Sequence, residues 1–371
     1  MGAGCSSNPR LERPSGEHKQ KAAPKENPSS RYAVPEVAAL AATDPSMFNV
    51  ADVVGAMPPP LSRPLAADVK IWSFDIHKVA ATDLPSLCFG AILQHPEVAE
   101  VLPPLSLQRL WAYTQEIASL YRDNTFHNYR HAVDVTLATS CLLRWAKEAH
   151  PGLLSDLQVV AMLVAAMVHD TDHPGVMNGF LVATRHELAV RYNDQSVNEQ
   201  HHIATALGLL SSRPELDWMG PLPAAVQETL RQTMTDAIMQ TDPAKHIPFM
   251  KQFAEDVAAK QVSAQQVITA ILKAADISNP TRPLAVYGEW ITAIMHEFFA
   301  QGDQEKALGL PVSMNCDRDT VNVDKCQVGF ISFLVNPVWK GLAEFLPQVK
   351  GQLLPVLQSN LEHFQARAQT S

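Results

Sequence analysis

Apolar residues recur at intervals of three and four along most of the chain from about residue 68 onward. This spacing places them on one face of an α-helix, whereas a half-buried strand would alternate apolar and polar residues. Such alternation is nearly absent, and short segments with Pro or Gly separate the periodic stretches. These stretches are residues 108–123, 134–150, 157–170, 196–210, 224–240, 263–276 and 286–301. The pattern predicts an all-α domain of about 300 residues, too large for a simple four-helix bundle.

The first 67 residues differ in composition from the rest of the chain. They include ten of the chain's 27 prolines, and residues 8–30 are polar and rich in Pro, Lys and Ser. Such a composition cannot bury enough apolar surface to become ordered. The sequence therefore predicts a flexible, disordered, Pro-rich arm over residues 1–67, followed by one compact multi-helix domain over residues 68–365.

Charge and cysteine content narrow the class of protein. The net charge of −9 argues against nucleic-acid binding, which usually needs a basic face. The five cysteines are scattered and include no C-x-x-C pair, so a disulfide scaffold and a thiolate zinc site are both disfavoured. No apolar run is long enough to span a membrane and no secretory signal is present. A cytoplasmic protein fits best.

One octapeptide concentrates the candidate chemistry. VHDTDHPG, residues 168–175, directly follows the apolar run of residues 159–167 and contains His169, Asp170 and His173. Buried polar groups are unfavourable unless something pairs with them. The Pro-Gly pair predicts that the helix ends there, with both histidines four residues apart on one helix face.

Two other helices are expected to bring similar residues to their ends. His127 and His131 are again four apart, and an apolar stretch ends on Asp276 just before Asn-Pro. Eight of the fourteen histidines lie within residues 127–202, a density that favours a metal centre. Imidazole and carboxylate ligands without thiolate suit a catalytic zinc. A neighbouring magnesium or manganese ion, sharing one carboxylate, would complete a site for phosphate-ester hydrolysis.

Six segments then show a family resemblance. FHNYRHAVDV, HDTDHPGVMNGF, ELAVRYNDQSVNEQHH, TDPAKH, KAADISNPTRP and KCQVGFISFLVNPVW occur in the order found in class I cyclic nucleotide phosphodiesterases, of the HD-type metal phosphohydrolases. The resemblance covers roughly residues 68–365. It implies the family's all-α catalytic domain and hydrolysis of 3′,5′-cyclic nucleotides to nucleoside 5′-monophosphates, which terminates cyclic nucleotide signalling.

The resemblance also implies roles for individual residues. The zinc ligands would be His131, His169, Asp170 and Asp276, and Asp170 would bridge to a second metal, usually magnesium. The water molecules on that second ion would be held by His173, Glu199 and Thr241. A hydroxide between the two metals would attack phosphorus in line, and His127 would be the general acid that protonates the departing O3′. His201 and His202 receive no catalytic role.

The base would be bound by a purine pocket. Gln327 matches the family's purine-binding glutamine. Its amide can hydrogen-bond adenine in one orientation and guanine in the flipped orientation. Phe330 would stack on the purine, with Ile294 opposite. Asn279 and Tyr287 resemble the cAMP-selective members, so cAMP is favoured, while a dual-specificity or cGMP enzyme stays open. A broader HD-type nucleotide phosphohydrolase and an inactive nucleotide sensor are less well supported.

The N-terminus reads MGAGCSS. Gly2 opens an N-myristoylation pattern and Cys5 is well placed for palmitoylation. Because one myristoyl chain binds membranes only marginally, the cysteine would supply the second anchor. We therefore expect the enzyme on the cytoplasmic face of a membrane. The expected partners are a cyclic nucleotide, that membrane and, as an open alternative to a monomer, a second copy of the chain.

Overall fold

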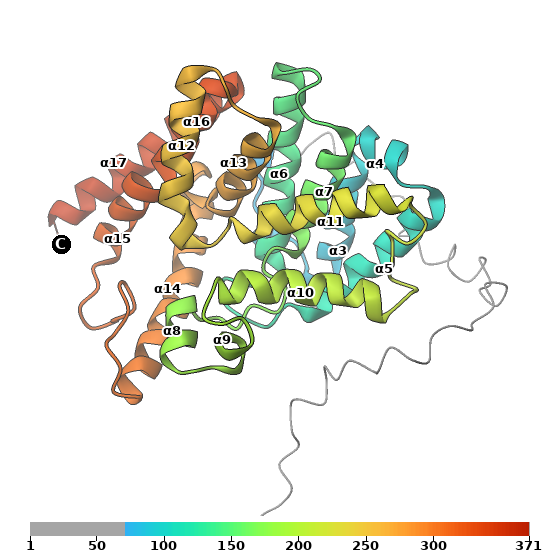
Figure 1. Cartoon of the computed structure of the whole chain (residues 1–371). Coiled ribbons are helices and arrows are strands. Elements are labelled where there is room, and N and C mark those ends of the chain that lie inside the picture. Colours follow the sequence, from blue (N-terminus) through green and yellow to red (C-terminus); the bar gives the residue numbers. More distant parts are fainter. Residues whose placement is uncertain (1–70, 371) are drawn as a thin grey trace, which may run out of the picture. The chain divides into compact units, whose positions relative to one another are not determined.

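The computed structural model describes residues 71–370, which are helical throughout their regular structure and contain no strand (Figure 1). This confirms the prediction of an all-α fold. Contacts divide the chain into residues 1–48 and residues 49–371, and everything described here lies in the second unit. The predicted arm, its acylation signal and the boundary near residue 67 lie outside the described residues.

Most of the helices follow one another with short connections, and the longest loop joins α14 to α15. Their bounds are α3 (Leu84–Leu93), α4 (Pro96–Val101), α5 (Pro104–Leu120), α6 (Tyr129–Ala149), α7 (Asp156–Val168), α8 (Asn178–Ala183), α9 (Glu187–Arg191), α10 (Val197–Ser212), α11 (Ala224–Met239), α12 (His246–Ala259), α13 (Ala264–Asp276), α14 (Leu284–Ala307), α15 (Val323–Phe330), α16 (Asn336–Phe345) and α17 (Leu354–Thr370). The 3₁₀ turns that matter below are η4 (Ile71–Ser73) and η8 (Asn279–Thr281). The π-helical turns are η9 (Ile331–Val335) and η10 (Val349–Leu353).

Helix α7 forms the centre of the core. All its residues from 159 to 168 are fully buried, and it packs against α3, α4, α6, α11 and α13. A helix that is apolar on every side belongs inside a protein. Its C-terminal end therefore delivers the next residues, His169 and Asp170, to the interior.

Capping fixes where α7 and α13 begin. Ser155 and Gln158 form a capping box at the start of α7, and Ser263 and Gln266 form another at the start of α13. Each box satisfies backbone N–H groups that have no partner within the helix. With their beginnings fixed, the two helices end close to each other and carry their polar residues to one place.

The end of α7 differs from the prediction. The helix stops at Val168, six residues before Pro174, because Asp172 adopts a left-handed conformation with φ of 59°. Its carboxylate is held by Arg122 Nε (2.6 Å) and His201 Nε2 (2.8 Å). The prediction that His169 and His173 share a helix face is therefore wrong: they lie on successive tight turns instead.

Candidate metal centre and active site

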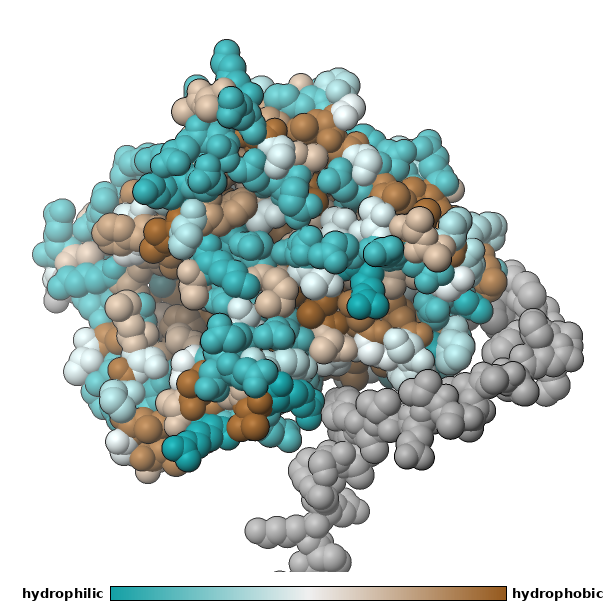
Figure 2. Space-filling view, viewed as in Figure 1, coloured by the Kyte–Doolittle hydropathy of each residue, from teal (hydrophilic) through white to brown (hydrophobic). Residues whose placement is uncertain are grey.

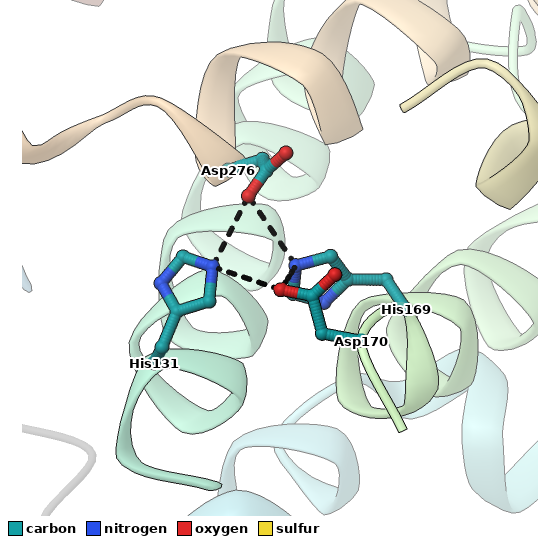
Figure 3. A group of neighbouring side chains, drawn as sticks. All are labelled: His131, His169, Asp170 and Asp276. Carbon is teal, nitrogen blue, oxygen red and sulfur yellow. Dashed lines mark hydrogen bonds and ion pairs between the residues drawn. The ribbon is translucent and has the colours of Figure 1, made fainter. Parts of the chain in front are cut away.

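Four side chains from three helices converge on one point (Figure 3). His131 lies in the first turn of α6, Asp276 is the last residue of α13, and His169 and Asp170 directly follow α7. Their ligand atoms all lie within 4.8 Å of one another. The structure thus brings together the four residues that the sequence predicts as metal ligands.

The distances fit a shared cation. Asp276 Oδ1 lies 3.1 Å from His131 Nε2 and 3.3 Å from His169 Nε2. Asp170 Oδ2 lies 3.5 Å and 3.3 Å from the same two nitrogens. Two imidazole nitrogens and two carboxylate oxygens, without thiolate, form a donor set typical of catalytic zinc. The cluster could therefore hold a metal ion.

Hydrogen bonding prepares His169 for such a role. Its Nδ1 donates to the carbonyl oxygen of Ala166 (2.9 Å), so a neutral ring presents the lone pair of Nε2 to the cluster. Burial alone would lower the pKa of His169, but Asp170 and Asp276 raise it well above the usual value. These carboxylates thus favour a second proton on Nε2, which a bound metal would displace to reach the lone pair. Burial would raise the pKa of Asp170, yet His169 holds it well below the usual range. The carboxylates therefore stay ionised, as metal ligands must.

Beside this cluster, His127 forms a pair with Glu297 of α14. His127 Nδ1 lies 2.7 Å from Glu297 Oε2, while Glu297 Oε1 accepts from the backbone N–H groups of Phe126 and His127. Burial would lower the pKa of His127, but the Glu297 carboxylate raises it above the usual value. The buried carboxylate thus favours the protonated imidazole, in which Nε2–H is available to donate.

The sequence reasoning missed Glu297. No motif marks it: it is one acidic residue in the apolar stretch of residues 286–301. The one available signal was a carboxylate on the buried face of a helix, which needs a partner. The sequence predicts that His127 lies one helical turn before His131. In the structure His127 precedes the helix instead, because α6 begins at Tyr129 and is capped by Asn128.

His173 stacks on His127, with ring centroids 4.0 Å apart. Its Nδ1 accepts from the backbone N–H of Gly175 (3.0 Å), which leaves the proton on Nε2. Burial is the largest of the effects that hold the pKa of His173 well below the usual value, followed by repulsion from His127. His173 is therefore a neutral hydrogen-bond donor next to His127.

Glu199 lies in the first turn of α10, where Asn178 Nδ2 donates to its Oε2 (3.0 Å). Burial raises the pKa of Glu199 to about 7. Thr241 follows α11, and its hydroxyl donates to the carbonyl oxygen of Ile238. Within the described residues no direct hydrogen bond joins Thr241 to His173 or Glu199.

His201 and His202 hold the loop that follows α7. His201 pairs with Asp172, and His202 Nδ1 donates to the carbonyl oxygen of Thr171 (2.9 Å). His202 Nε2 also lies 3.6 Å from Asp170 Oδ1. Burial lowers the pKa of His202 to about 4, so the ring is neutral. These contacts position the loop that follows α7.

The predicted purine-binding residues lie on α14, α15 and η8. Gln327 is buried, and Tyr287 of α14 donates from its hydroxyl to Gln327 Oε1 (2.7 Å). Phe330 and Ile294 are half-buried against the core. Asn279 is buried at the start of η8, and its Nδ2 has no hydrogen-bond partner among the described residues. The structure joins Gln327 to Tyr287, whereas no hydrogen bond joins Asn279 to either.

The surface around these elements is mixed in polarity. In Figure 2 the face drawn is hollowed to the left of its centre, beside the region where Figure 1 draws α14 and α15.

None of the helices in the described part of the chain combines the length and apolar composition needed to cross a lipid bilayer.

Comparison with known proteins identifies the family. Residues 126–356 match the model of the 3′,5′-cyclic nucleotide phosphodiesterase family. A Drosophila melanogaster relative named 3′,5′-cyclic-AMP phosphodiesterase, isoform F, is 33% identical over 319 residues, covering 81% of this chain and 47% of the relative. The rat 3′,5′-cyclic-AMP phosphodiesterase 4C is 34% identical over 321 residues, covering 82% of this chain and 59% of the relative. The chain therefore spans about half the length of the curated relatives it matches.

A solved structure agrees with this result. The phosphodiesterase domain of the rhodopsin–phosphodiesterase fusion protein from the choanoflagellate Salpingoeca rosetta superposes with a TM-score of 0.75 at 28% identity. The match covers 82% of this chain and 97% of that domain. The family model, the sequence relatives and the shared helical fold agree, and the chain belongs to the 3′,5′-cyclic nucleotide phosphodiesterase family.

Proposed function

We propose that this chain hydrolyses 3′,5′-cyclic nucleotides, with cAMP preferred, to nucleoside 5′-monophosphates. The observation that carries the proposal is the convergence of two histidines and two aspartates within 4.8 Å, next to the His127–Glu297 pair. Membership of the family and the names of the relatives, which are cAMP phosphodiesterases, support the same activity. As a signalling enzyme it would terminate the cyclic nucleotide signal.

The metals would be held by the cluster of His131, His169, Asp170 and Asp276. Its imidazole and carboxylate donors suit zinc, and the Asp170 carboxylate would also serve a neighbouring magnesium or manganese ion. When bound, two such ions supply a nucleophile at neutral pH and positive charge beside the phosphate. The residues that would orient water on the second ion are His173, Glu199 and Thr241.

His127 would act as the general acid. Glu297 orients its ring and keeps it protonated through Nδ1, so Nε2–H would donate a proton to O3′ as the P–O3′ bond breaks. Glu297 is on this account a positioning residue, since it touches His127 rather than the nucleotide. A well-placed proton donor contributes about 10²–10⁴-fold in rate.

Base preference would follow from how the Gln327 amide is held. Because Tyr287 donates to Oε1, the amide nitrogen of Gln327 faces the other way as a donor, and Oε1 keeps a second lone pair. Adenine presents an acceptor and an amino donor side by side, whereas guanine presents two acceptors at the corresponding edge. The fixed amide therefore favours adenine. Phe330 and Ile294 would enclose the purine, and Asn279 would contribute its unpaired amide.

The N-terminal lipid anchor stays a separate proposal. Gly2 and Cys5 lie outside the described residues, and only their sequence pattern supports dual acylation. Acylation would place the enzyme on the cytoplasmic face of a membrane. A homodimer likewise stays a prediction.

The test of the activity is direct. Purified protein is incubated with magnesium and either cAMP or cGMP, and the products are identified by chromatography. We expect 5′-AMP, with much slower release of 5′-GMP. Equal rates for both nucleotides would overturn the proposed preference, and no product from either would overturn the activity.

A further inference from the structure

A groove of about 1060 Å³ lies between α12 and α16, two helices that pack side by side (Figure 1). Its walls are largely apolar and include Ile247, Met250, Val257, Phe333 and Phe345. Ile247 is 65% exposed and Phe333 is 75% exposed. Large apolar side chains gathered in one exposed concave place mark an interaction surface. No residue of the metal cluster or the purine pocket lines this groove.

The charge of the groove limits what can occupy it. Three lysines line it, Lys251, Lys260 and Lys340, against the single carboxylate of Glu344. This is a positive surface on a chain whose net charge is −9. A suitable occupant is therefore apolar on one face, carries negative charge and has no lysine or arginine.

The described chain begins against α16, one of the two helices that form the groove. The Trp72 ring stacks on Trp145 of α6, with centroids 5.6 Å apart, and meets Trp339 of α16 edge-on at 5.8 Å. The next residue after Trp339 is Lys340, which lines the groove. The turn η4, where the described chain begins, therefore lies against the helix that forms one groove wall.

One segment ahead of that entry point matches the groove. Residues 49–57 read NVADVVGAM, and the spacing of Val50, Val53, Val54 and Met57 is that of one helical face. Asp52 is its one charge, and no lysine or arginine occurs in residues 49–62. The residues from 58 to 71 can extend roughly 3.3 Å each, or about 45 Å in all, several times the width of a helix.

We propose that residues 49–57 dock into the groove between α12 and α16, with the face of Val50, Val53, Val54 and Met57 against Ile247 and Phe333. Asp52 then lies near the groove lysines. This inference is independent of the proposed function.

Docking there would brace the purine-binding helix. Phe333 belongs to η9, which directly follows α15, and His246 Nε2 of α12 donates to the carbonyl oxygen of Leu334 (2.9 Å) in the same turn. A segment packed on this surface therefore restrains the end of the helix that carries Gln327.

The expected strength of docking depends on the tether, the residues that join the segment to the described structure. A segment this short does not hold a helix alone in water. A short tether, however, gives it an effective concentration of about 1 mM, and an intrinsic dissociation constant near 100 µM would then protect the groove about tenfold.

Hydrogen–deuterium exchange on the full chain tests the proposal. The variant Val53→Asp/Val54→Asp should exchange the amides of α12 and α16 about tenfold faster than wild type. The matched control Ala38→Asp/Ala39→Asp adds the same charge elsewhere in the N-terminal region and should exchange like wild type. Unchanged exchange of α7 in all three proteins shows that the fold is intact.

A substitution in the groove itself gives an independent test. Phe333→Ser should speed exchange of α12 as the segment variant does, and combining the two variants should add little more. Identical α12 and α16 exchange in wild type and Val53→Asp/Val54→Asp would overturn the proposal. Protection that rises with protein concentration would also overturn it, because a second copy would then be the occupant.

Discussion

The orientation of each imidazole decides what the site can do at the scale of single residues. His169 and His127 both donate from Nδ1, to a backbone carbonyl and to Glu297, so each turns Nε2 inward. His173 accepts at Nδ1 from Gly175 and remains neutral. Local spacing indicated the His and Asp residues at the helix ends, and the family resemblance supplied the proposed ligand set. The sequence could not predict these partners, since Glu297 is 170 residues from His127 along the chain.

Glu297→Gln should narrow the active pH range. The carboxylate raises the pKa of His127, so the protonated acid persists to higher pH and is lost as pH rises through that value. Without the charge the pKa falls, and the alkaline limb of kcat/KM should move to lower pH, with a loss of roughly tenfold or more at neutral pH.

The matched control is Glu289→Gln on the same helix, where the carboxylate is 57% exposed and faces His77. It should keep the wild-type profile. An alkaline limb that stays in place in Glu297→Gln would contradict the role of Glu297.

Tyr287→Phe should weaken base selectivity without removing the purine pocket. The lost hydroxyl frees the Gln327 amide to turn, so the ratio of kcat/KM for cAMP over cGMP should fall, by roughly 5- to 12-fold for one hydrogen bond. Steady-state kinetics with both nucleotides measures this ratio. A ratio equal to that of wild type would mean that another group fixes the amide.

Elements differ in how far local sequence determines their ends. Helix α13 ends at Asp276 as predicted, because Asn-Pro follows within four residues. Helix α7 ends six residues before the Pro-Gly pair, because Arg122 and His201 hold Asp172 in a left-handed turn. Arg122 lies 50 residues away in sequence. Such tertiary contacts override local signals and leave no trace in the periodicity.

The loop between α14 and α15 depends on one glycine. A Cβ on Gly302 of α14 would lie 1.9 Å from the carbonyl oxygen of Cys316, so Gly302→Ala must displace the loop. We expect a loss of about 1–3 kcal/mol in the free energy of unfolding from overpacking. This outweighs the gain of about 0.5–1 kcal/mol that alanine brings inside a helix.

Chemical denaturation compares this variant with Gly288→Ala on the same helix, where a Cβ meets nothing within 4 Å. That control should be as stable as wild type or more so. Equal stability of both variants would show that the loop does not need Gly302.

For the whole molecule, composition and periodicity were sufficient to predict the all-α class. They could not predict which helices pack together, because packing depends on shape as well as on apolarity. The groove between α12 and α16 illustrates this: its lining residues come from three separate stretches of the chain. The centre of the core was easier to predict from the sequence, since the apolar run of α7 is too uniform for a surface helix.

Gly2→Ala should separate location from chemistry. If the N-terminus is acylated in eukaryotic cells, this variant moves to the soluble fraction while its rate per molecule stays unchanged. Cys5→Ser should give partial release, since a myristoyl chain alone holds weakly. Cell fractionation with activity assays measures both quantities. Equal distribution of wild type and Gly2→Ala would contradict the anchor.

The central claim is that His131, His169, Asp170 and Asp276 hold a catalytic metal. The most direct test measures bound zinc by mass spectrometry and 5′-AMP release in the same preparations of wild type, Asp276→Ala and Asp236→Ala. Asp236 is an exposed aspartate on α11, so its variant should match wild type. Asp276→Ala should keep its helical circular dichroism while zinc content and hydrolysis fall together. An Asp276→Ala protein that retains both zinc and full activity would contradict the account.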